Sequence, residues 1–203
     1  MIEKVYYLNL EHRKDRKDIF LSWMKESNYD VSKVERINAI YNYERGHIGC
    51  LMSHIKALDA FISSEYDKCI IFEDDYHPVN VKTFWNDINK LKNIDFDLVM
   101  LFYNECDLEI EDTEYDFLKR CFFSYTSSGY VISKHFAYKL KELFEECVAL
   151  ADNEVNVSHH FCLDVYWKKL MKETEKWYCF YPRLGYQIES YSDILKKVVD
   201  YKC

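Results

Sequence analysis

A strand-like segment that leads directly into a helix-like segment is the feature that most constrains this fold. Residues 4–10, KVYYLNL, are rich in the β-branched and aromatic residues that favour strands. Residues 15–29 then place apolar side chains at helical spacing, with Asp15 as a candidate cap, and residues 33–41 read as a second strand. The chain therefore begins β-α-β, as nucleotide-binding α/β folds do.

The same alternation of helices and strands continues along the chain. The expected elements are a helix within 46–67 that begins at Ser53 or earlier, a strand at 68–75, a helix at 80–93, a strand at 96–102, a strand and helix at 127–150, a helix at 163–175, and a late strand with a polar tail at 176–194. Residues 103–120 are acidic and read as an irregular surface excursion. Because no repeat or boundary interrupts the chain, we expect one α/β domain over residues 1–203. It should have three layers and a mixed, mostly parallel sheet.

Composition excludes some classes of partner. The net charge of −8 disfavours a general nucleic-acid surface. The eight cysteines form no CxxC pair and several lie in apolar runs, which favours reduced thiols in a cytosol-like compartment. We expect neither a signal peptide nor a transmembrane segment. The triplet at 156–158 fits a glycosylation sequon, which carries little weight in a cytosolic chain.

Three consecutive acids follow a run of apolar residues in the segment CIIFEDDYHP, residues 69–78. Glu73, Asp74 and Asp75 repel one another unless a cation lies among them. Ligand sites of α/β sheets gather at the carboxyl ends of strands, and the Glu73-x-Asp75 spacing suits a divalent cation that bridges to a diphosphate. A strand exit with solvated acids explains the pattern about as well.

Two basic side chains follow the first strand. Asn9 ends that strand, and Arg13 and Arg16 share a face if they are helical. Arginine recognises phosphate through paired planar hydrogen bonds. A solvated first turn of mixed charge explains the same residues.

The segment GHIGCLMSH, residues 46–54, combines glycines with polar donors. Gly46 and Gly49 permit close approach of backbone to a ligand, and Ser53 and His54 add donors at the expected helix start, where phosphate binds readily. The segment lacks the Gly-Lys-Ser/Thr of ATPases, so ATPase chemistry is not indicated.

Two later segments offer further candidates. Ser127 and Gly129 enter a strand, where small residues either admit a sugar or form a turn. His159 and His160 are adjacent rather than at the i, i+4 spacing of a zinc-binding helix, and are read as surface histidines. Asp164 opens a helix, where it serves either as a first-turn acid or as a general base.

Taken in order, these segments resemble glycosyltransferase family 25, which includes lipopolysaccharide β-galactosyltransferases and procollagen galactosyltransferases. The resemblance covers nearly the whole chain. It rests on the ordered segments YYLNLEHRKDR, GHIGCLMSHIKAL, IIFEDDYHP, FDLVML, SSGYVISKHFAYKL, LDVYW and YPRLGYQIESYSDI.

The resemblance implies a GT-A-type, Rossmann-like domain that uses a UDP-sugar and Mn²⁺ or Mg²⁺ and inverts the anomeric carbon. Glu73 and Asp75 match the family's metal motif. The positions that the resemblance assigns to the UDP-sugar donor are Asn9, Arg13, Arg16, Gly49, Ser53, His54, Asp74, Ser127, Gly129, Gln187 and Asp193. Asp164 stands where the family has a late acidic residue, although the usual Pro-Val-Asp lead-in is here Cys-Leu-Asp. On this basis Asp164 is the expected general base.

The family also sets expectations for partners. Galactose is the favoured sugar, ahead of glucose and N-acetylated sugars, and the acceptor is a glycan, a lipopolysaccharide or a hydroxylysine-bearing protein. The expected location is cytoplasmic, or peripheral at a membrane that carries a lipid-linked acceptor. The alternative is a non-catalytic UDP-sugar-binding or interaction module, which the intact motifs disfavour. The motifs outside the acid cluster likewise disfavour a nucleotidyltransferase or a metal phosphohydrolase.

Overall fold

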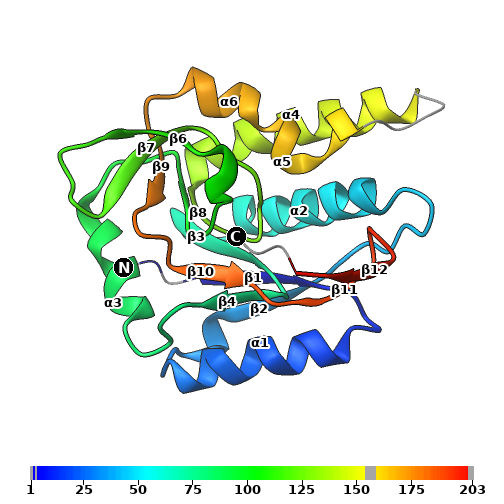
Figure 1. Cartoon of the computed structure of the whole chain (residues 1–203), viewed down its shortest axis with the longest axis horizontal. Helices are drawn as coiled ribbons and strands as arrows, with labels where there is room; N and C mark the ends of the chain where they lie inside the picture. Colours follow the sequence, from blue (N-terminus) through cyan, green and yellow to red (C-terminus); the bar gives the residue numbers. More distant parts are fainter. Residues whose placement is uncertain (1, 3, 154–158, 201–203) are drawn as a thin grey trace.

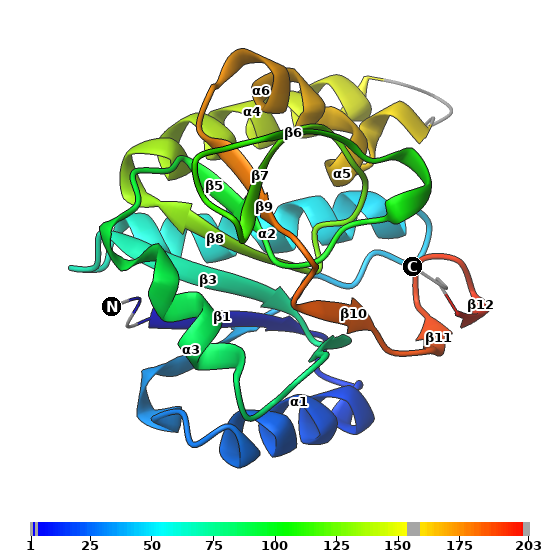
Figure 2. The ribbon, with the colours of Figure 1, turned by 60° about the vertical axis from the view of Figure 1, so that its left-hand side comes forward.

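An eight-stranded sheet forms the centre of the molecule in the computed structural model, which describes residues 2, 4–153 and 159–200. The strand order is β2-β1-β3-β8-β5-β9-β7-β6 (Figure 2). The strands are β1 (Lys4–Asn9), β2 (Val34–Asn38), β3 (Lys68–Glu73), β5 (Leu98–Met100), β6 (Glu109–Asp112), β7 (Leu118–Phe123), β8 (Gly129–Ser133) and β9 (Trp177–Phe180). Strands β8 and β7 run against the others. The predicted mixed, mostly parallel sheet is confirmed.

Helices cover both faces of this sheet (Figure 1). One face carries α1 (Lys14–Glu26) and α3 (Phe84–Asn89). The other carries α2 (Gly46–Ile62), α4 (Lys134–Asp152), α5 (Leu163–Tyr166) and α6 (Lys168–Glu173). Each face has its own cluster of buried apolar side chains. The predicted three-layer α/β arrangement is therefore confirmed.

Strand β1 shows how the sequence builds these two layers. Side chains alternate between the faces of a strand. Tyr6 and Leu8 accordingly join the cluster under α2, and Val5 and Tyr7 join the cluster under α1. All four are nearly inaccessible to solvent, as expected for a central strand that is covered on both sides.

Three predicted helices differ in detail from the structure. Helix α1 begins at Lys14 with Arg13 at the cap position, so Asp15 lies in the first turn instead of capping it. Helix α2 begins at Gly46, which agrees with the predicted start at Ser53 or earlier, but Ser53 and His54 lie well inside the helix and are not donors at its start. The helix expected at 163–175 is two short helices, α5 and α6, that meet at Trp167.

The acidic segment expected to be irregular contains a hairpin. Strands β6 and β7 pair with each other, and β7 also pairs with β9. The pairing that orders this segment comes from a strand about 60 residues later in the chain, which local composition does not reveal. The remaining short turns of 3-10 helix are Val31–Lys33, Lys90–Asn93, Glu105–Asp107 and His159–Phe161.

After β9 the chain returns to the end of the first three strands. Strand β10 (Gly185–Gln187) pairs with β4 (Tyr76–Pro78), which follows the acid cluster directly. Strands β11 (Ser190–Ser192) and β12 (Lys197–Val199) then form a hairpin, here called the C-terminal hairpin (residues 190–199). Figure 1 shows β10 and β11 beside the ends of β1 and β4. The late sequence is thereby brought to the edge where the acids lie.

No helix in the described ranges combines the length and apolar character that a membrane crossing requires. The cysteines in the same ranges are free thiols. The predicted sequon at 156–158 lies outside the described residues.

The junction between β4 and β10 requires a glycine at position 185. Tyr76 is completely buried, and its ring packs directly against Gly185. A Cβ atom at position 185 would lie 2.2 Å from Cζ of Tyr76, which is far inside van der Waals contact. Only glycine therefore lets β10 pair with β4 at this distance.

We expect Gly185→Ala to destabilise the protein by about 1–3 kcal/mol, the usual cost of overpacking a well-packed core. Urea unfolding measures this cost. Tyr76→Val removes the ring that the new methyl group meets, so the double variant should lose less stability than the sum of the single variants. Strictly additive costs would show that the contact with Tyr76 is not the cause.

Candidate functional site

Two buried acids at the end of β3, Asp74 and Asp75, lie beside two half-buried residues, Glu73 and Arg16. Asp74 and Asp75 expose 6% and 4% of their surface. Arg16, from the first part of α1, places Nη1 3.0 Å from Oδ1 of Asp74 and 3.0 Å from Oδ2 of Asp75. The predicted neighbours Arg16, Glu73, Asp74 and Asp75 therefore do form one cluster.

Burial and mutual repulsion set the charge of this cluster. Burial raises the pKa of Asp75 to about 7; Arg16 opposes this rise, while Glu73 and Asp74 add to it. Burial also raises the pKa of Asp74, against the opposing effects of Arg16 and Asn9. Burial acts in the same direction on Glu73, but His54 and its other partners outweigh it and leave the pKa of Glu73 below its ordinary value. Arg16 therefore offsets only part of the negative charge.

Neutral donors from distant segments orient the three carboxylates. The Asn9 amide donates to Oδ2 of Asp74 over 2.6 Å. The Ser127 hydroxyl donates to Oε1 of Glu73 over 2.7 Å. The Gln187 amide lies 3.4 Å from Oδ1 of Asp75. These residues were predicted at the donor site, and each of them contacts one of the three acids.

Arg13 binds groups of the chain itself, whereas its position in the sequence suggested that it would bind phosphate. Its Nε and Nη2 atoms donate to the two carboxylate oxygens of Asp15. Its Nη1 atom donates to the Tyr191 carbonyl and to Asp193, each over 2.7 Å. Four of the five N–H donors of a guanidinium thus have partners within the chain. Hydrogen bonding to Asp15 raises the pKa of Arg13, so its guanidinium stays charged.

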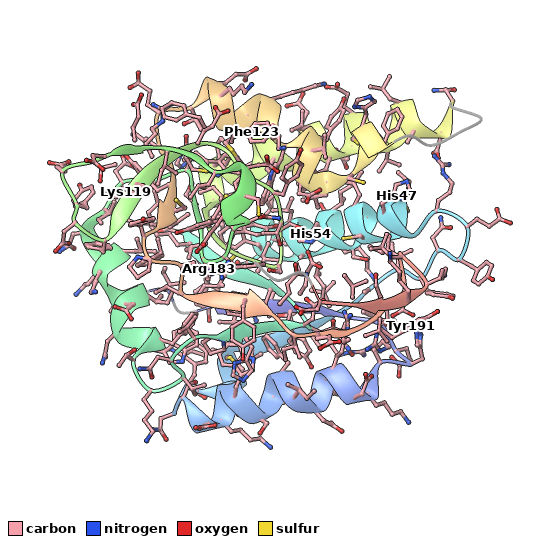
Figure 3. The ribbon with its side chains drawn as sticks, viewed as in Figure 1. His47, His54, Lys119, Phe123, Arg183 and Tyr191 are labelled. Carbon is pink, nitrogen blue, oxygen red and sulfur yellow. The ribbon has the colours of Figure 1, made fainter. Side chains whose placement is uncertain are left out.

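Arg13 and Arg16 together hold the C-terminal hairpin over the site. Arg16 donates to the hydroxyl of Ser190 and to the Tyr191 carbonyl over 2.7 and 3.1 Å. The carboxylate of the predicted residue Asp193 contacts the side chains of both Arg13 and His12. Figure 3 shows Tyr191 on this hairpin. Both predicted arginines therefore bind the late part of the chain, although Arg13 precedes helix α1 and does not share a helix face with Arg16.

The predicted residues of α2 are more buried than a ligand-binding loop would be. Ser53 donates to the carbonyl of Gly49 and accepts from the amide of Ile40, which ties the loop after β2 to α2. A Cβ on Gly49 would lie 2.6 Å from the Ile40 carbonyl, so only glycine lets this loop pack so closely on α2. His54 is fully buried on α2 (Figure 3). A Cβ atom at position 129 would clash with the ring of Tyr76, so the structure requires glycine there.

Two cavities open on either side of the acid cluster and share a wall. The first is lined by Arg13, Arg16, the loop 39–42, the three acids and Asp193. The second is lined by Tyr125, Thr126, Ser127, Cys162 and Asp164. Cys50, Glu73, Gln187 and Ile194 line both. The site thus consists of two adjoining cavities, here together called the cleft, one lined by all three acids and the other by Asp164, with Glu73 in the wall that they share.

Asp164 is held by a strained backbone. Its Oδ2 atom accepts a hydrogen bond from the Thr126 amide over 3.0 Å. Thr126 has a φ of 79°, a conformation that a β-branched residue adopts at a cost of roughly 1–3 kcal/mol. The Thr126 hydroxyl also lies 3.3 Å from the Gln187 side-chain oxygen. Strain of this kind persists where surrounding contacts impose it, and here it accompanies the hydrogen bond from the Thr126 amide to Asp164 at the start of α5.

Sequence reasoning missed several residues of this cleft. Thr126 carries no sequence signal, because its strain exists only in the folded chain. Lys168 does not line the cleft but packs behind Tyr125, which does: its Nζ atom lies 3.5 Å from the ring centroid of Phe123 and 3.2 Å from that of Tyr125, and burial lowers its pKa to about 8. Cys50 lies within the segment 46–54, and its position four residues before His54 is the signal that could have identified it.

The acid cluster fits a hard divalent cation. Glu73 and Asp75 line the cleft and offer carboxylate oxygens, the ligands preferred by Mn²⁺ and Mg²⁺. The raised pKa of Asp75 reflects negative charge that Arg16 does not fully offset. A cation among these oxygens would remove the remaining repulsion.

The uncompensated charge makes a prediction about stability. A carboxyl whose folded-state pKa is raised binds its proton more tightly when folded. The free energy of unfolding should therefore fall as pH rises from about 3.9, the ordinary pKa of Asp, to about 7, the folded value of Asp75. Asp75→Asn removes this slope, so it should stabilise the metal-free protein near pH 8 more than near pH 5.

Thermal unfolding in EDTA across this pH range measures the effect. Asp112→Asn is the matched control, because the side chain of Asp112 is 91% exposed. Equal pH slopes for the wild type and Asp75→Asn would contradict a raised pKa at Asp75.

Comparison with known proteins places these segments in a family. The family described as glycosyltransferase family 25 (LPS biosynthesis protein) matches residues 33–155, more than half of the chain. The chain is 24% identical over 169 residues to procollagen galactosyltransferase 2 of Homo sapiens and 26% identical over 172 residues to that of Mus musculus. Each match covers 68% of this chain, and the chain spans 27% of the length of these relatives.

Two solved structures share the fold. The crystal structure of A197 from STIV superposes with a TM-score of 0.56 at 13% identity, over 98% of this chain and 93% of that one. Mannose-1-phosphate geranyltransferase from Thermus thermophilus gives a TM-score of 0.51 at 7% identity, over 89% and 74%. At these identities the likeness concerns the fold alone, and it agrees with the GT-A-like class expected from the sequence.

Proposed function

The chain belongs to glycosyltransferase family 25, and from this premise we propose that it transfers a hexose from a UDP-sugar to an acceptor hydroxyl with inversion at the anomeric carbon. Galactose is the favoured sugar, in line with the names of the two curated relatives. The observation that carries the proposal is the cluster of Glu73, Asp74 and Asp75, which lines one cavity and shares Glu73 with the adjoining cavity of Asp164.

The donor belongs on the side of the cleft that holds the acids. Glu73 and Asp75 would hold Mn²⁺ or Mg²⁺, which when bound offsets the charge of the diphosphate leaving group. Arg16 lies between Asp74 and Asp75 and keeps these carboxylates in place. Tyr41 and Asn42 line the same cavity beyond Ile40, and we assign this wall to the nucleoside.

Asn9, Ser53 and Arg13 support this site through contacts within the chain. Asn9 orients Asp74, and Ser53 fixes the loop after β2. Arg13 fastens the C-terminal hairpin through Asp193. We propose that these three residues hold neighbouring groups in place, whereas Arg16, Gln187 and the acids face the ligand.

The acceptor belongs on the side of the cleft that holds Asp164. A general base must lie on the face of the sugar opposite the leaving diphosphate for the reaction to invert. We propose Asp164 for this role because it lines the adjoining cavity, which shares only the wall of Cys50, Glu73, Gln187 and Ile194 with the donor cavity. The Thr126 amide donates a hydrogen bond to one carboxylate oxygen of Asp164 and so fixes the position of that side chain.

The acceptor class stays a proposal: a glycan, a lipopolysaccharide or a protein-linked hydroxyl. The free thiols favour a reducing compartment, so a cytoplasmic location, with or without peripheral attachment at a membrane, also stays a prediction. The competing proposal is a module that binds a UDP-sugar without turning it over.

The first test is UDP release from a panel of UDP-sugars, with Mn²⁺ and with EDTA. We expect slow hydrolysis of one sugar that depends on Mn²⁺ and is lost in Asp75→Ala, since that variant lacks a carboxylate at the cation site. Asp112→Ala is the matched control, because it removes an exposed carboxylate. Calorimetric titration with UDP checks binding where hydrolysis is absent. No binding and no release by folded protein would overturn the proposal, and binding without turnover would favour the non-catalytic module.

A second test addresses the base. We expect Asp164→Asn to lower the transfer rate by about 10²–10⁴-fold, the usual contribution of a positioned general base. Affinity for UDP should stay close to that of the wild type, because Asp164 does not line the donor cavity. Steady-state kinetics with the identified donor measures both quantities. A rate within tenfold of the wild type would assign the base to another residue.

A further inference from the structure

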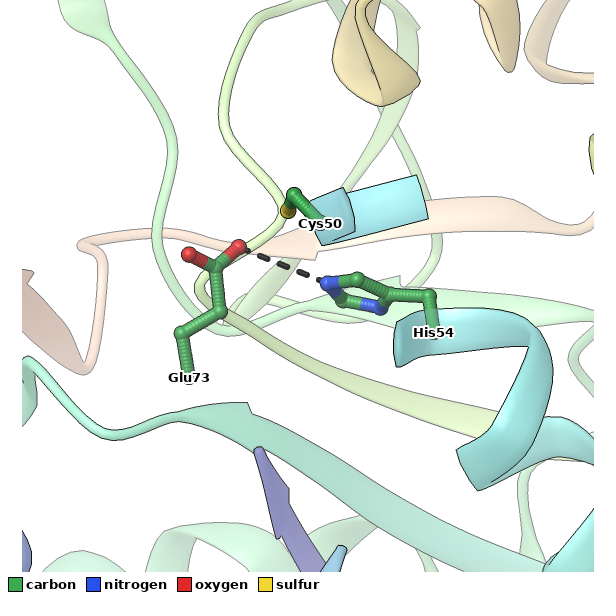
Figure 4. Close-up of side chains that lie close together, drawn as sticks. All are labelled: Cys50, His54 and Glu73. Carbon is green, nitrogen blue, oxygen red and sulfur yellow. Dashed lines mark ion pairs between the residues drawn. The ribbon is translucent and has the colours of Figure 1, made fainter. Parts of the chain in front are cut away.

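A second group of metal-ligand side chains lies at the shared wall of the cleft. Cys50 and His54 are four residues apart on α2, so they lie on one face of that helix. Glu73, at the end of β3, faces them (Figure 4). The thiol, imidazole and carboxylate ligand atoms all lie within 4.8 Å of one another.

His54 has a buried nitrogen without a hydrogen bond. Its side chain is fully buried, and its Nδ1 atom lies 3.0 Å from the hydroxyl of Tyr130. Its Nε2 atom has no hydrogen-bond partner. The nearest carboxylate oxygen, Oε1 of Glu73, is 3.5 Å away, an ion-pair distance. A buried polar atom in this state is costly and calls for an explanation.

The spacing suits two ligands of one tetrahedral ion. Zinc binds imidazole nitrogen and carboxylate oxygen at about 2.0–2.2 Å, which at the tetrahedral angle separates the two ligand atoms by roughly 3.3–3.5 Å. The observed Nε2–Oε1 distance of 3.5 Å falls at the upper end of this range. Thiolate and imidazole are ligands that select zinc over the oxygen-preferring Mn²⁺ and Mg²⁺.

We propose that Cys50, His54 and Glu73 form a binding site for Zn²⁺ with an open fourth position. Cys50 and Glu73 line both cavities, so an ion and a water molecule reach the site from the cleft. With its proton on Nδ1 and donated to Tyr130, His54 presents the Nε2 lone pair towards the other two ligands. Ser127 orients the Glu73 carboxylate in the same way. Partners of this kind fix the orientation of metal ligands in proteins.

The thiol is protonated before the metal arrives. Burial raises the pKa of Cys50, with Glu73 and Asp164 adding to the effect. Coordination to a zinc ion deprotonates a thiol outright, so binding releases a proton.

The site has a consequence for activity that rests on the proposed function. Glu73 would serve both the Zn²⁺ site and the Mn²⁺ site of the donor. A zinc ion that takes Glu73 removes a ligand from the catalytic cation, so Zn²⁺ should inhibit transfer. Excess Mn²⁺ should relieve this inhibition, because the two ions compete for one carboxylate.

Metal binding tests the site without any donor or turnover. The metal-stripped full chain is titrated with Zn²⁺ in competition with a chromophoric chelator, and separately with Co²⁺. We expect one tight Zn²⁺ per chain and, with Co²⁺, the near-ultraviolet charge-transfer band of a thiolate–cobalt bond. Loss of a hydrogen-bond partner of a metal ligand typically weakens binding by about 10–100-fold, so Cys50→Ser should weaken Zn²⁺ binding at least that much.

Cys162→Ser is the matched control, because Cys162 is a half-buried thiol that lines only the Asp164 side of the cleft. It should bind Zn²⁺ as the wild type does. Unchanged Zn²⁺ affinity in Cys50→Ser, or a Co²⁺ complex of the wild type without the thiolate band, would overturn the proposal and leave His54 and Glu73 as a plain ion pair. The cobalt spectrum of the wild type needs no variant, so the test survives a variant that fails to fold. Both outcomes are independent of whether a UDP-sugar is turned over.

Discussion

The crowding of three carboxylates at the end of β3, two of them buried and one half-buried, is the constraint on which the rest of the site depends. Glu73, Asp74 and Asp75 cannot share a low-dielectric edge as bare anions, because their repulsion grows as water is removed. Arg16 offsets part of this charge, and the amide of Asn9 and the hydroxyl of Ser127 orient the oxygens. What remains uncompensated is the electrostatic basis for binding a cation, which links the stability of the fold to the proposed chemistry.

The second constraint is that the late chain must return to this edge. Gly185 lets β10 pack on the buried ring of Tyr76, and that pairing delivers Gln187 to Asp75. The guanidinium of Arg13 then fastens the C-terminal hairpin through Asp193. The arginines that the sequence suggested as phosphate ligands thus hold the hairpin that lines one wall of the cavity. Charge and packing act here on the same few side chains.

The sharing of Glu73 connects the two metal proposals. Its carboxylate stands between a set of oxygen ligands that includes Asp75 and a set of soft ligands, Cys50 and His54. Hard and soft cations therefore distinguish two occupancies of the same cleft. The identity of the bound ion would decide whether Glu73 faces the donor or is withdrawn from it.

The sequence by itself determined the layered α/β fold, because alternating strand and helix periodicities specify which faces are buried, as β1 shows. It also predicted that Asn9 meets the acid cluster, since the carboxyl ends of the parallel neighbours β1 and β3 lie at one edge, whereas Ser127 and Gln187 were assigned to the site through the family resemblance. The tertiary structure alone decided the β6–β7 hairpin, the strain of Thr126, the engagement of Arg13 and the approach of Cys50 and His54 to Glu73. Each of these depends on contacts between segments far apart in the chain, whose distances and orientations no local pattern encodes.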